Sequence, residues 1–121
     1  MKVAIIGSRE GFTEEFVHKK LWVLLANLLT SGTIITGGAY GVDSYAESFA
    51  KKFGCNLEII KPVDPANKSH YLYRNVEIIT KADNIIAFWN GESRGTKFVI
   101  DYAKARNKDI VVVEDTGVKH G

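Results

Sequence analysis

Three turns in this 121-residue chain have the composition of phosphate-binding loops, and each follows a short apolar run. They are Gly7-Ser8-Arg9, Gly37-Gly38-Ala39-Tyr40-Gly41-Val42-Asp43 and Asn90-Gly91-Glu92-Ser93-Arg94-Gly95-Thr96. Glycine lets backbone N–H groups approach an anion closely, and a helix that begins after such a turn adds its positive end. Loops that follow parallel strands meet at one edge of the sheet. Together the three turns predict one composite pocket for a phosphate-bearing ligand.

The second turn differs from two well-known phosphate-binding patterns. Its spacing is G-G-x-x-G, whereas the dinucleotide fingerprint is G-x-G-x-x-G, and the Gly-Lys-Ser/Thr of a Walker loop is absent from the sequence. Asp43, two residues after Gly41, has two interpretations. It is an acid that favours the positive end of the following helix, or it accepts a hydrogen bond from a ribose hydroxyl or a base edge.

The third turn places a cation where a helix disfavours one. Ser93 or Thr96 suits the N-cap of the helix that follows, but Arg94 would lie at its positive end. A bound anion would resolve that conflict, and close approach of the backbone to a ligand would explain Gly95, which lowers helix propensity.

Further along the chain, other side chains suit a phosphorylated ligand. Arg9 carries a planar donor fork suited to phosphate. Arg74 and Asn75 fall within a predicted helix and belong either to a solvated face or to the pocket, where the neighbouring Tyr71 and Tyr73 would offer an aromatic platform. The full candidate set for ligand binding is Gly7, Ser8, Arg9, Gly37, Gly38, Ala39, Gly41, Asp43, Arg74, Asn75, Asn90, Ser93, Arg94, Gly95 and Thr96.

Other kinds of site are not indicated. His18, His70 and His120 lie in unrelated contexts, and no His or Cys pair has metal-ligand spacing, so we expect no metal. The serines lack the turn of a nucleophile elbow. We expect no obligatory cofactor beyond a nucleotide ligand.

Composition fits one ordinary domain. The net charge of +2 is too balanced to indicate nucleic-acid binding by itself, and the single Cys55 cannot form an intramolecular disulfide. No apolar run approaches the roughly 20 residues that span a bilayer, so we expect a cytoplasmic protein without a membrane partner. We expect the domain to occupy residues 1–114, with a flexible tail over 115–121.

Short β-rich runs alternate with helical ones, which predicts an α/β fold. We expect strands at 2–6, 33–36, 56–60, 84–88 and 109–113, which are nearly continuous in apolarity, as in strands covered on both faces. Helices are expected from Thr13 to about Thr30, along 42–53, over 70–80 with Leu72, Val76 and Ile79 buried, and over 96–106. Right-handed crossovers then give a doubly wound, parallel, five-stranded Rossmann-like sheet of order 3-2-1-4-5 with helices on both faces.

The ordered set of motifs resembles the SLOG superfamily. That group includes the DNA-processing protein A (Smf) family, the Lonely guy (LOG) enzymes and the YspA/YpsA-type proteins. The residues that match are Ala4 to Arg9, Gly37 to Asp43 with Ala46 and Ala50, Arg74-Asn75, and Ala82 through Thr96. The Gly-Gly-Ala-x-Gly-x-Asp and Ser-Arg-Gly-Thr segments are most similar to the YspA-type (DUF2493-like) branch. The resemblance implies a Rossmann-like domain, a homodimer, and a nucleoside monophosphate, an ADP-ribose-like signal or single-stranded DNA as ligand.

One departure from the superfamily bears on catalysis. The phosphoribohydrolase branch reads Pro-Gly-Gly-x-Gly-Thr-x-x-Glu with a catalytic Glu, and Val99 stands at that position here. Arg74 would match the Arg of that branch but would lack its acid. The sequence therefore favours a small sensor or carrier of a phosphorylated, nucleotide-derived ligand. The alternatives are a nucleoside 5′-monophosphate N-glycosidase, with Glu92 or Asp101 as a substitute acid, and a single-stranded DNA binder.

Overall fold

The computed structural model describes residues 1–26 and 32–114, which form an alternating series of strands and helices. The elements are β1 (Lys2–Gly7), α1 (Glu14–Leu25), β2 (Thr33–Thr36), α2 (Val42–Phe53), β3 (Asn56–Ile59), α3 (Lys68–Lys81), β4 (Asn84–Phe88), α4 (Arg94–Ala105) and β5 (Asp109–Val113). Each strand lies within one residue of its predicted bounds. The predicted end of the first helix near Thr30 and the predicted tail over 115–121 fall outside the described residues.

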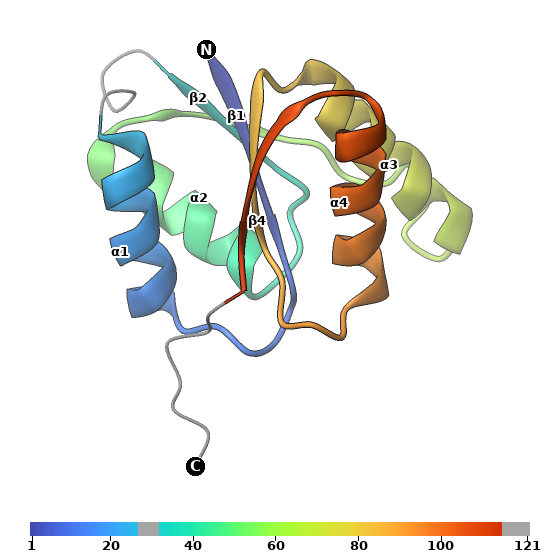
Figure 1. Ribbon diagram of the computed structural model, residues 1–121, viewed down its shortest axis with the longest axis horizontal. Coiled ribbons are helices and arrows are strands. Elements are labelled where there is room, and N and C mark those ends of the chain that lie inside the picture. Colours follow the sequence, from blue (N-terminus) through green and yellow to red (C-terminus); the bar gives the residue numbers. More distant parts are fainter. Residues whose placement is uncertain (27–31, 115–121) are drawn as a thin grey trace.

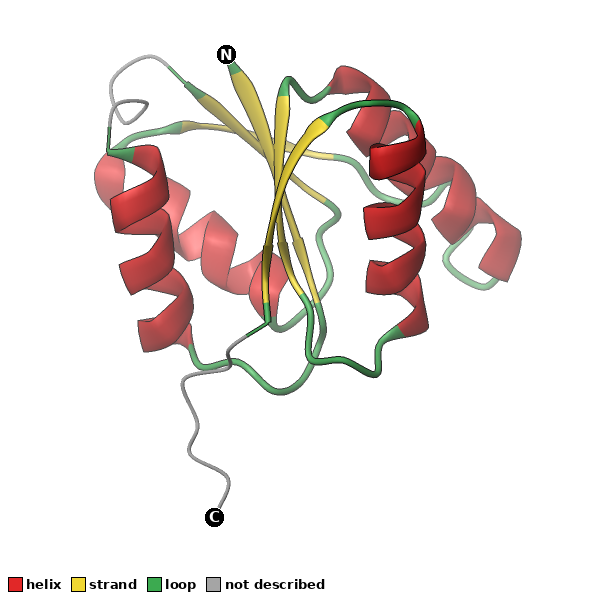
Figure 2. Cartoon of the chain, in the orientation of Figure 1, coloured by secondary structure: helices red, strands yellow, loops and turns green. Residues whose placement is uncertain are grey.

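The five strands form one parallel sheet in the predicted order, β3-β2-β1-β4-β5. Helices α1 and α2 cover one face, and α3 and α4 cover the other (Figure 1; Figure 2). Because all strands run in the same direction, the loops after β1, β2 and β4 lie at the same edge, at the lower end of the sheet in Figure 1. The doubly wound α/β fold is thus confirmed, and its carboxyl edge carries the three glycine-containing turns.

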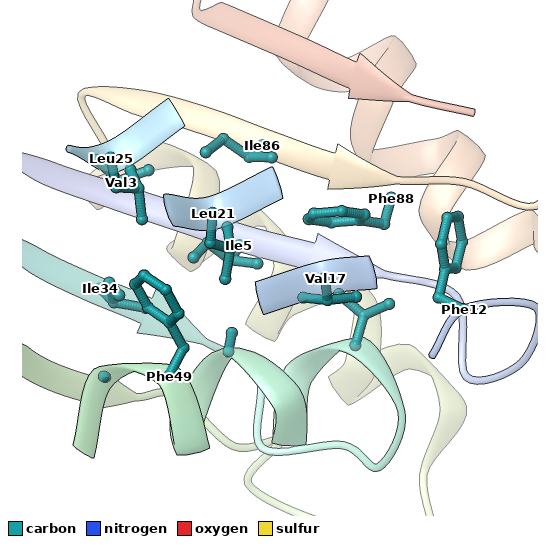
Figure 3. Packing of buried hydrophobic residues seen from close by; sticks show 13 residues of the cluster. Val3, Ile5, Phe12, Val17, Leu21, Leu25, Ile34, Phe49, Ile86 and Phe88 are labelled. Atoms are coloured by element: carbon teal, nitrogen blue, oxygen red, sulfur yellow. The ribbon is translucent and has the colours of Figure 1, made fainter. Parts of the chain in front are cut away.

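The central strand explains why the strands read as continuous apolar runs. Val3 and Ile5 point into a cluster beneath α1 and α2, while Ala4 and Ile6 point into a second cluster beneath α3 and α4. Figure 3 shows the first cluster, in which Ile5 lies among side chains of the neighbouring strands and α1. A strand buried on both faces needs apolar residues at successive positions rather than at alternate ones.

Helix starts follow the predicted capping chemistry. Thr13 is the N-cap of α1, and its hydroxyl accepts a hydrogen bond of 3.1 Å from the Phe16 N–H. Ser93, rather than Thr96, caps α4, and its hydroxyl accepts from the Thr96 N–H. Each cap satisfies a backbone donor that the first helical turn leaves without an intrahelical partner. The cap at Ser93 also fixes where α4 begins at the edge of the candidate pocket.

The buried face of α3 differs from the predicted one. Ile79 is buried as expected, but Leu72 is 45% exposed and Val76 only half-buried, while Ile78 and Ala82 complete the packed face. The physical reason is the position of the helix, whose first half extends past the sheet (Figure 1). There its inner side meets the polar loops at the carboxyl edge instead of the core.

None of the helices within residues 1–26 and 32–114 is long and apolar enough to cross a membrane.

Two alanine substitutions on α3 test the corrected buried face. Ile79→Ala should lower the free energy of unfolding by about 2–5 kcal/mol, because Ile79 is 1% exposed and its removal leaves a cavity. Leu72→Ala should change it by less than about 0.5 kcal/mol, as expected for a surface side chain. Urea denaturation of both variants measures the difference. Similar decreases in the free energy of unfolding would contradict the corrected face and support the one expected from the sequence.

Candidate functional site

A cavity of about 530 Å³ opens at the carboxyl edge of the sheet, between the loops after β1, β2 and β4 and the inner side of α3. It is lined by Ile6, Gly7, Arg9, Glu10, Gly37, Ala39, Tyr40, Asp43, Tyr71, Arg74, Asn75, Ile78, Asn90, Glu92, Ser93, Gly95 and Thr96. The cavity flanks the switch point, where β1 and β4 lie side by side although their crossovers run to opposite faces. Open α/β sheets bind ligands at this place.

Most of the candidate residues meet at this cavity, but Ser8, Gly38, Gly41 and Arg94 are not among its lining residues. Ser8 and Gly41 lie just beneath the wall and are buried. Gly38 and Arg94 are exposed. The structure thus brings the three turns together with α3, as the composite pocket requires, and gives these four residues positions outside its lining.

Asn90 and Ser8 join the loops after β1 and β4. The Ser8 hydroxyl accepts a hydrogen bond of 3.1 Å from the Asn90 N–H. The Asn90 side-chain oxygen accepts from the N–H groups of Glu92 (2.9 Å) and Ser93 (3.0 Å), and its amide nitrogen donates to the Glu10 carbonyl. With these contacts made within the protein, the first role of Asn90 is to shape the loop before α4.

Asp43 fixes the loop between β2 and α2. It is only 6% exposed, and its Oδ2 accepts hydrogen bonds of 3.2 Å from the N–H groups of Gly37 and Ala39. Burial raises the pKa of Asp43 to about 6, against the lowering effects of these N–H groups and of Arg74. The acid therefore does more than favour the positive end of α2, because it also ties the phosphate-type turn to the helix.

Arg74 connects α3 to the same loop. Its Nη1 donates to the Gly37 carbonyl, its Nε donates to the Asn75 Oδ1 at 2.8 Å, and its guanidinium lies 5.3 Å from the centroid of the Tyr71 ring. Partial burial lowers the pKa of Arg74, while the nearby Asp43 charge raises it. Arg74 and Asn75 thus belong to the pocket rather than to a solvated face, and Tyr71, unlike the exposed Tyr73, lines the cavity with them.

Arg9 forms a second arginine–tyrosine pair at the rim. Its guanidinium lies 5.1 Å from the centroid of the Tyr40 ring, and both side chains are exposed and line the cavity. The pair joins the loop after β1 to the loop after β2. Each arginine of the cavity is therefore held against an aromatic face, which limits its rotamers while leaving donor groups for a ligand.

Two glycines of the second turn lie in close contact with other parts of the protein, and at Gly41 backbone atoms leave no room for a side chain. A Cβ at position 37 would lie 2.5 Å from the Arg74 Nη1, and one at position 41 would lie 2.5 Å from the Arg9 carbonyl oxygen. Gly41 also has a φ of 79°, which side chains rarely adopt. These glycines let the loops and α3 approach one another, and their role in the approach of an anion stays a prediction.

The start of α4 contributes Ser93, Gly95 and Thr96 to the cavity wall, while Arg94 is exposed and does not line it. Thr96 is buried, and its hydroxyl accepts from Ser93 at 3.1 Å. A Cβ at Gly95 would meet no protein atom within 4 Å, so packing within the described residues does not demand glycine there. The role of Gly95 in ligand approach stays a prediction.

The position of the absent catalytic acid lies inside the core. Val99 is 0% exposed and belongs to the cluster beneath α3 and α4. Of the two substitute acids considered, Glu92 lines the cavity, whereas Asp101 is an exposed partner of Lys97 at 2.9 Å and does not line it.

Sequence reasoning missed several lining residues, namely Ile6, Glu10, Tyr40 and Ile78. Ile6 and Ile78 form the apolar floor. Glu10 and Tyr40 each lie next to a residue or turn that was singled out, so adjacency was the one signal that could have found them.

No protein-family model matches the chain, and no curated protein matches it in sequence. Solved structures do share its fold. DNA processing protein A from Streptococcus pneumoniae superposes with a TM-score of 0.77 and 19% identity, over 92% of this chain and 49% of that chain. A structure of DNA processing protein A from Helicobacter pylori, described for its single-stranded DNA binding mode, gives 0.74 and 22%, over 93% and 64%. A protein named TM1055 gives 0.70 and 20%, over 90% and 71%.

The chain thus has the Rossmann-like α/β fold of these proteins, the fold that the SLOG resemblance implied. It spans 49% of the Streptococcus pneumoniae protein and 64% of the Helicobacter pylori protein, less than two thirds of either.

Asparagine at position 43 tests the buried carboxyl through the pH dependence of stability. The folded protein raises the Asp43 pKa from 3.8 to about 6, so ionisation costs the native state stability as the pH rises between these values. The full shift corresponds to about 3 kcal/mol at 1.36 kcal/mol per pKa unit. The charge of Arg74 lowers the pKa of Asp43 and that of Glu47 raises it, but burial has the largest effect.

We therefore expect Asp43→Asn to be as stable as the wild type near pH 4 and more stable, by up to about 3 kcal/mol, near pH 8. Urea denaturation across this pH range measures the difference. A difference that does not change with pH would show that the carboxyl titrates at its ordinary pKa.

Proposed function

We propose that the cavity binds a nucleotide or a nucleotide-derived phosphorylated ligand, and that the chain is a sensor or carrier domain of the SLOG type, YspA-like branch. The observation that carries the proposal is the convergence of two arginines and the starts of two helices on one cavity at the switch point of the sheet. Arg9 and Arg74 supply charge, and α2 and α4 supply their positive ends.

The part of the cavity between the two arginines and the start of α4 is suited to bind the phosphate. Gly95 and Thr96 belong to the first turn of α4 and line the cavity. The Thr96 N–H already donates to the Ser93 hydroxyl, so the Gly95 N–H is the backbone donor of this pair that would serve an anion. Gly41, the N-cap of α2, makes no side-chain capping hydrogen bond. An anion at the carboxyl edge would interact with both helix ends and both guanidinium groups.

The tyrosine rings at the cavity are suited to bind the base. Tyr40 and Tyr71 both line the cavity, and each already faces an arginine. Aromatic rings accept a base by stacking without demanding a particular base. This arrangement supports nucleotides in general and does not single out adenine or guanine.

Binding without turnover is part of the proposal. Val99 lies in the core at the position where the phosphoribohydrolase branch carries its catalytic Glu, so an acid from that position does not reach the cavity. A homodimer in a cytoplasmic setting, as the superfamily resemblance implies, belongs to the same proposal.

Single-stranded DNA is a second candidate ligand, favoured by the fold shared with DNA processing protein A. The exposed Arg9–Tyr40 pair offers the charge and the stacking face that a strand would use. The affinity for an oligonucleotide would fall steeply with salt, whereas a pocket-bound mononucleotide would depend on salt much less.

The proposed function predicts that Arg9→Ala weakens binding of adenosine or guanosine 5′-monophosphate by about 1.5–3 kcal/mol, the range for a hydrogen bond to a charged group. Arg106→Ala is the matched control, because Arg106 is also exposed and lies over a tyrosine ring, that of Tyr102, but outside the cavity. Titration calorimetry of the three proteins measures the difference. Equal losses in both variants, or no loss in Arg9→Ala, would contradict the placement of the ligand.

A further inference from the structure

The two oxygens of the Asp43 carboxyl have different surroundings. Oδ2 accepts the hydrogen bonds from Gly37 and Ala39, and Oδ1 accepts none from the described residues. Among these residues no fully buried side-chain oxygen is left without a hydrogen-bond partner, so Oδ1 reaches the space of the cavity that Asp43 lines. Asp43 as a whole is only 6% exposed, and its carboxyl meets solvent at the cavity.

A buried carboxylate with one free oxygen calls for a hydrogen-bond donor. Leaving it unsatisfied costs free energy, and the raised pKa of Asp43 reflects the part of that cost which the protein's own donors do not offset. With a pKa of about 6 the group is still mostly ionised at neutral pH and acts as an acceptor.

The position of Asp43 relative to Arg74 indicates which part of a ligand would supply the donor. The Arg74 charge acts on the Asp43 carboxyl, and both line the same wall of the cavity. In a nucleoside 5′-phosphate the sugar lies between the phosphate and the base. If the phosphate is near Arg74, the neighbouring donor is therefore a sugar hydroxyl rather than a base amine.

We propose that Asp43 Oδ1 accepts a hydrogen bond from a ribose hydroxyl, so that the site selects ribonucleotides over their deoxy counterparts. This inference rests on the proposed function, because it requires a nucleotide in the cavity. It assigns Asp43 a specificity role in addition to its structural one, and it disfavours DNA as the ligand of this site.

The test compares adenosine and guanosine 5′-monophosphates with their 2′-deoxy and 3′-deoxy counterparts, and with inosine 5′-monophosphate, by calorimetry near neutral pH. We expect loss of the contacting hydroxyl to weaken binding about 10- to 100-fold, as for a hydrogen bond to a charged acceptor. Inosine 5′-monophosphate, which lacks an exocyclic amine, should bind like the other ribonucleotides.

Asp43→Asn supplies the second arm. The asparagine oxygen can still accept from Gly37 and Ala39, which turns the amide NH₂ toward the cavity, and this group donates rather than accepts. A hydroxyl can still accept from this neutral amide but loses the charged acceptor, so the preference for ribose should shrink in Asp43→Asn to that of a neutral hydrogen bond. It should persist in Asp101→Asn, a matched control that makes the same chemical change at an exposed position outside the cavity.

Equal binding of ribo- and deoxynucleotides by the wild type would overturn this inference while leaving the proposed function in place. A ribose preference that is undiminished in Asp43→Asn, or a loss confined to inosine 5′-monophosphate, would also overturn it. Failure of every monophosphate to bind would instead overturn the proposed function itself.

Discussion

The walls of the candidate site depend on one buried carboxylate. Asp43 binds the N–H groups of Gly37 and Ala39, and Arg74 binds the Gly37 carbonyl from the opposite side. The turn after β2 is thereby held between α2 and α3, two helices that cover opposite faces of the sheet. These contacts tie the loop that carries Tyr40 to the start of α2 and to α3.

The charge of the site is local rather than general. Arg9 and Arg74 line the cavity together with Glu10, Glu92 and Asp43. Burial lowers the pKa of Arg74, and the Arg9 charge adds a smaller lowering. Their positions are maintained by tyrosine rings and backbone acceptors rather than by ion pairs with these acids. Such an arrangement suits a compact anion that approaches both guanidinium groups more than a long polyanion that needs a continuous basic track.

The strands could be predicted because burial on both faces requires continuous apolar runs, as in Val3 to Ile6. Their order could be predicted from the right-handed crossovers of parallel sheets. The inner side of α3 could not be predicted in this way. The spacing of Leu72, Val76 and Ile79 fits a helical stripe, but a competing face that contains Arg74 and Asn75 is recognised only when a polar cavity is known to lie against it. For the same reason, the contact of the pocket with α3 follows from the fold and not from a local sequence pattern.

The three turns could be assembled into one site from composition and fold rules alone, whereas the sequence left Arg74 between a solvated face and the pocket. The contacts of Asp43 with the loop, of Arg9 with Tyr40, and of Gly41 with the Arg9 backbone join segments about 30 residues apart or depend on one loop conformation. No local pattern encodes them. This is why the composition of the second turn could indicate an anion but not the contact of Gly41 with the Arg9 backbone.

The most direct test of the central claim maps where a nucleotide binds. In two-dimensional amide NMR spectra, titration with adenosine or guanosine 5′-monophosphate should shift the backbone signals of Gly37, Ala39, Gly95 and Thr96, which line the cavity. Signals at the opposite edge of the sheet, such as those of Asn84 and Asp109, should stay in place. Shifts confined to that opposite edge, or none at nucleotide concentrations of about 1 mM, the upper end of ordinary metabolite affinities, would contradict the account.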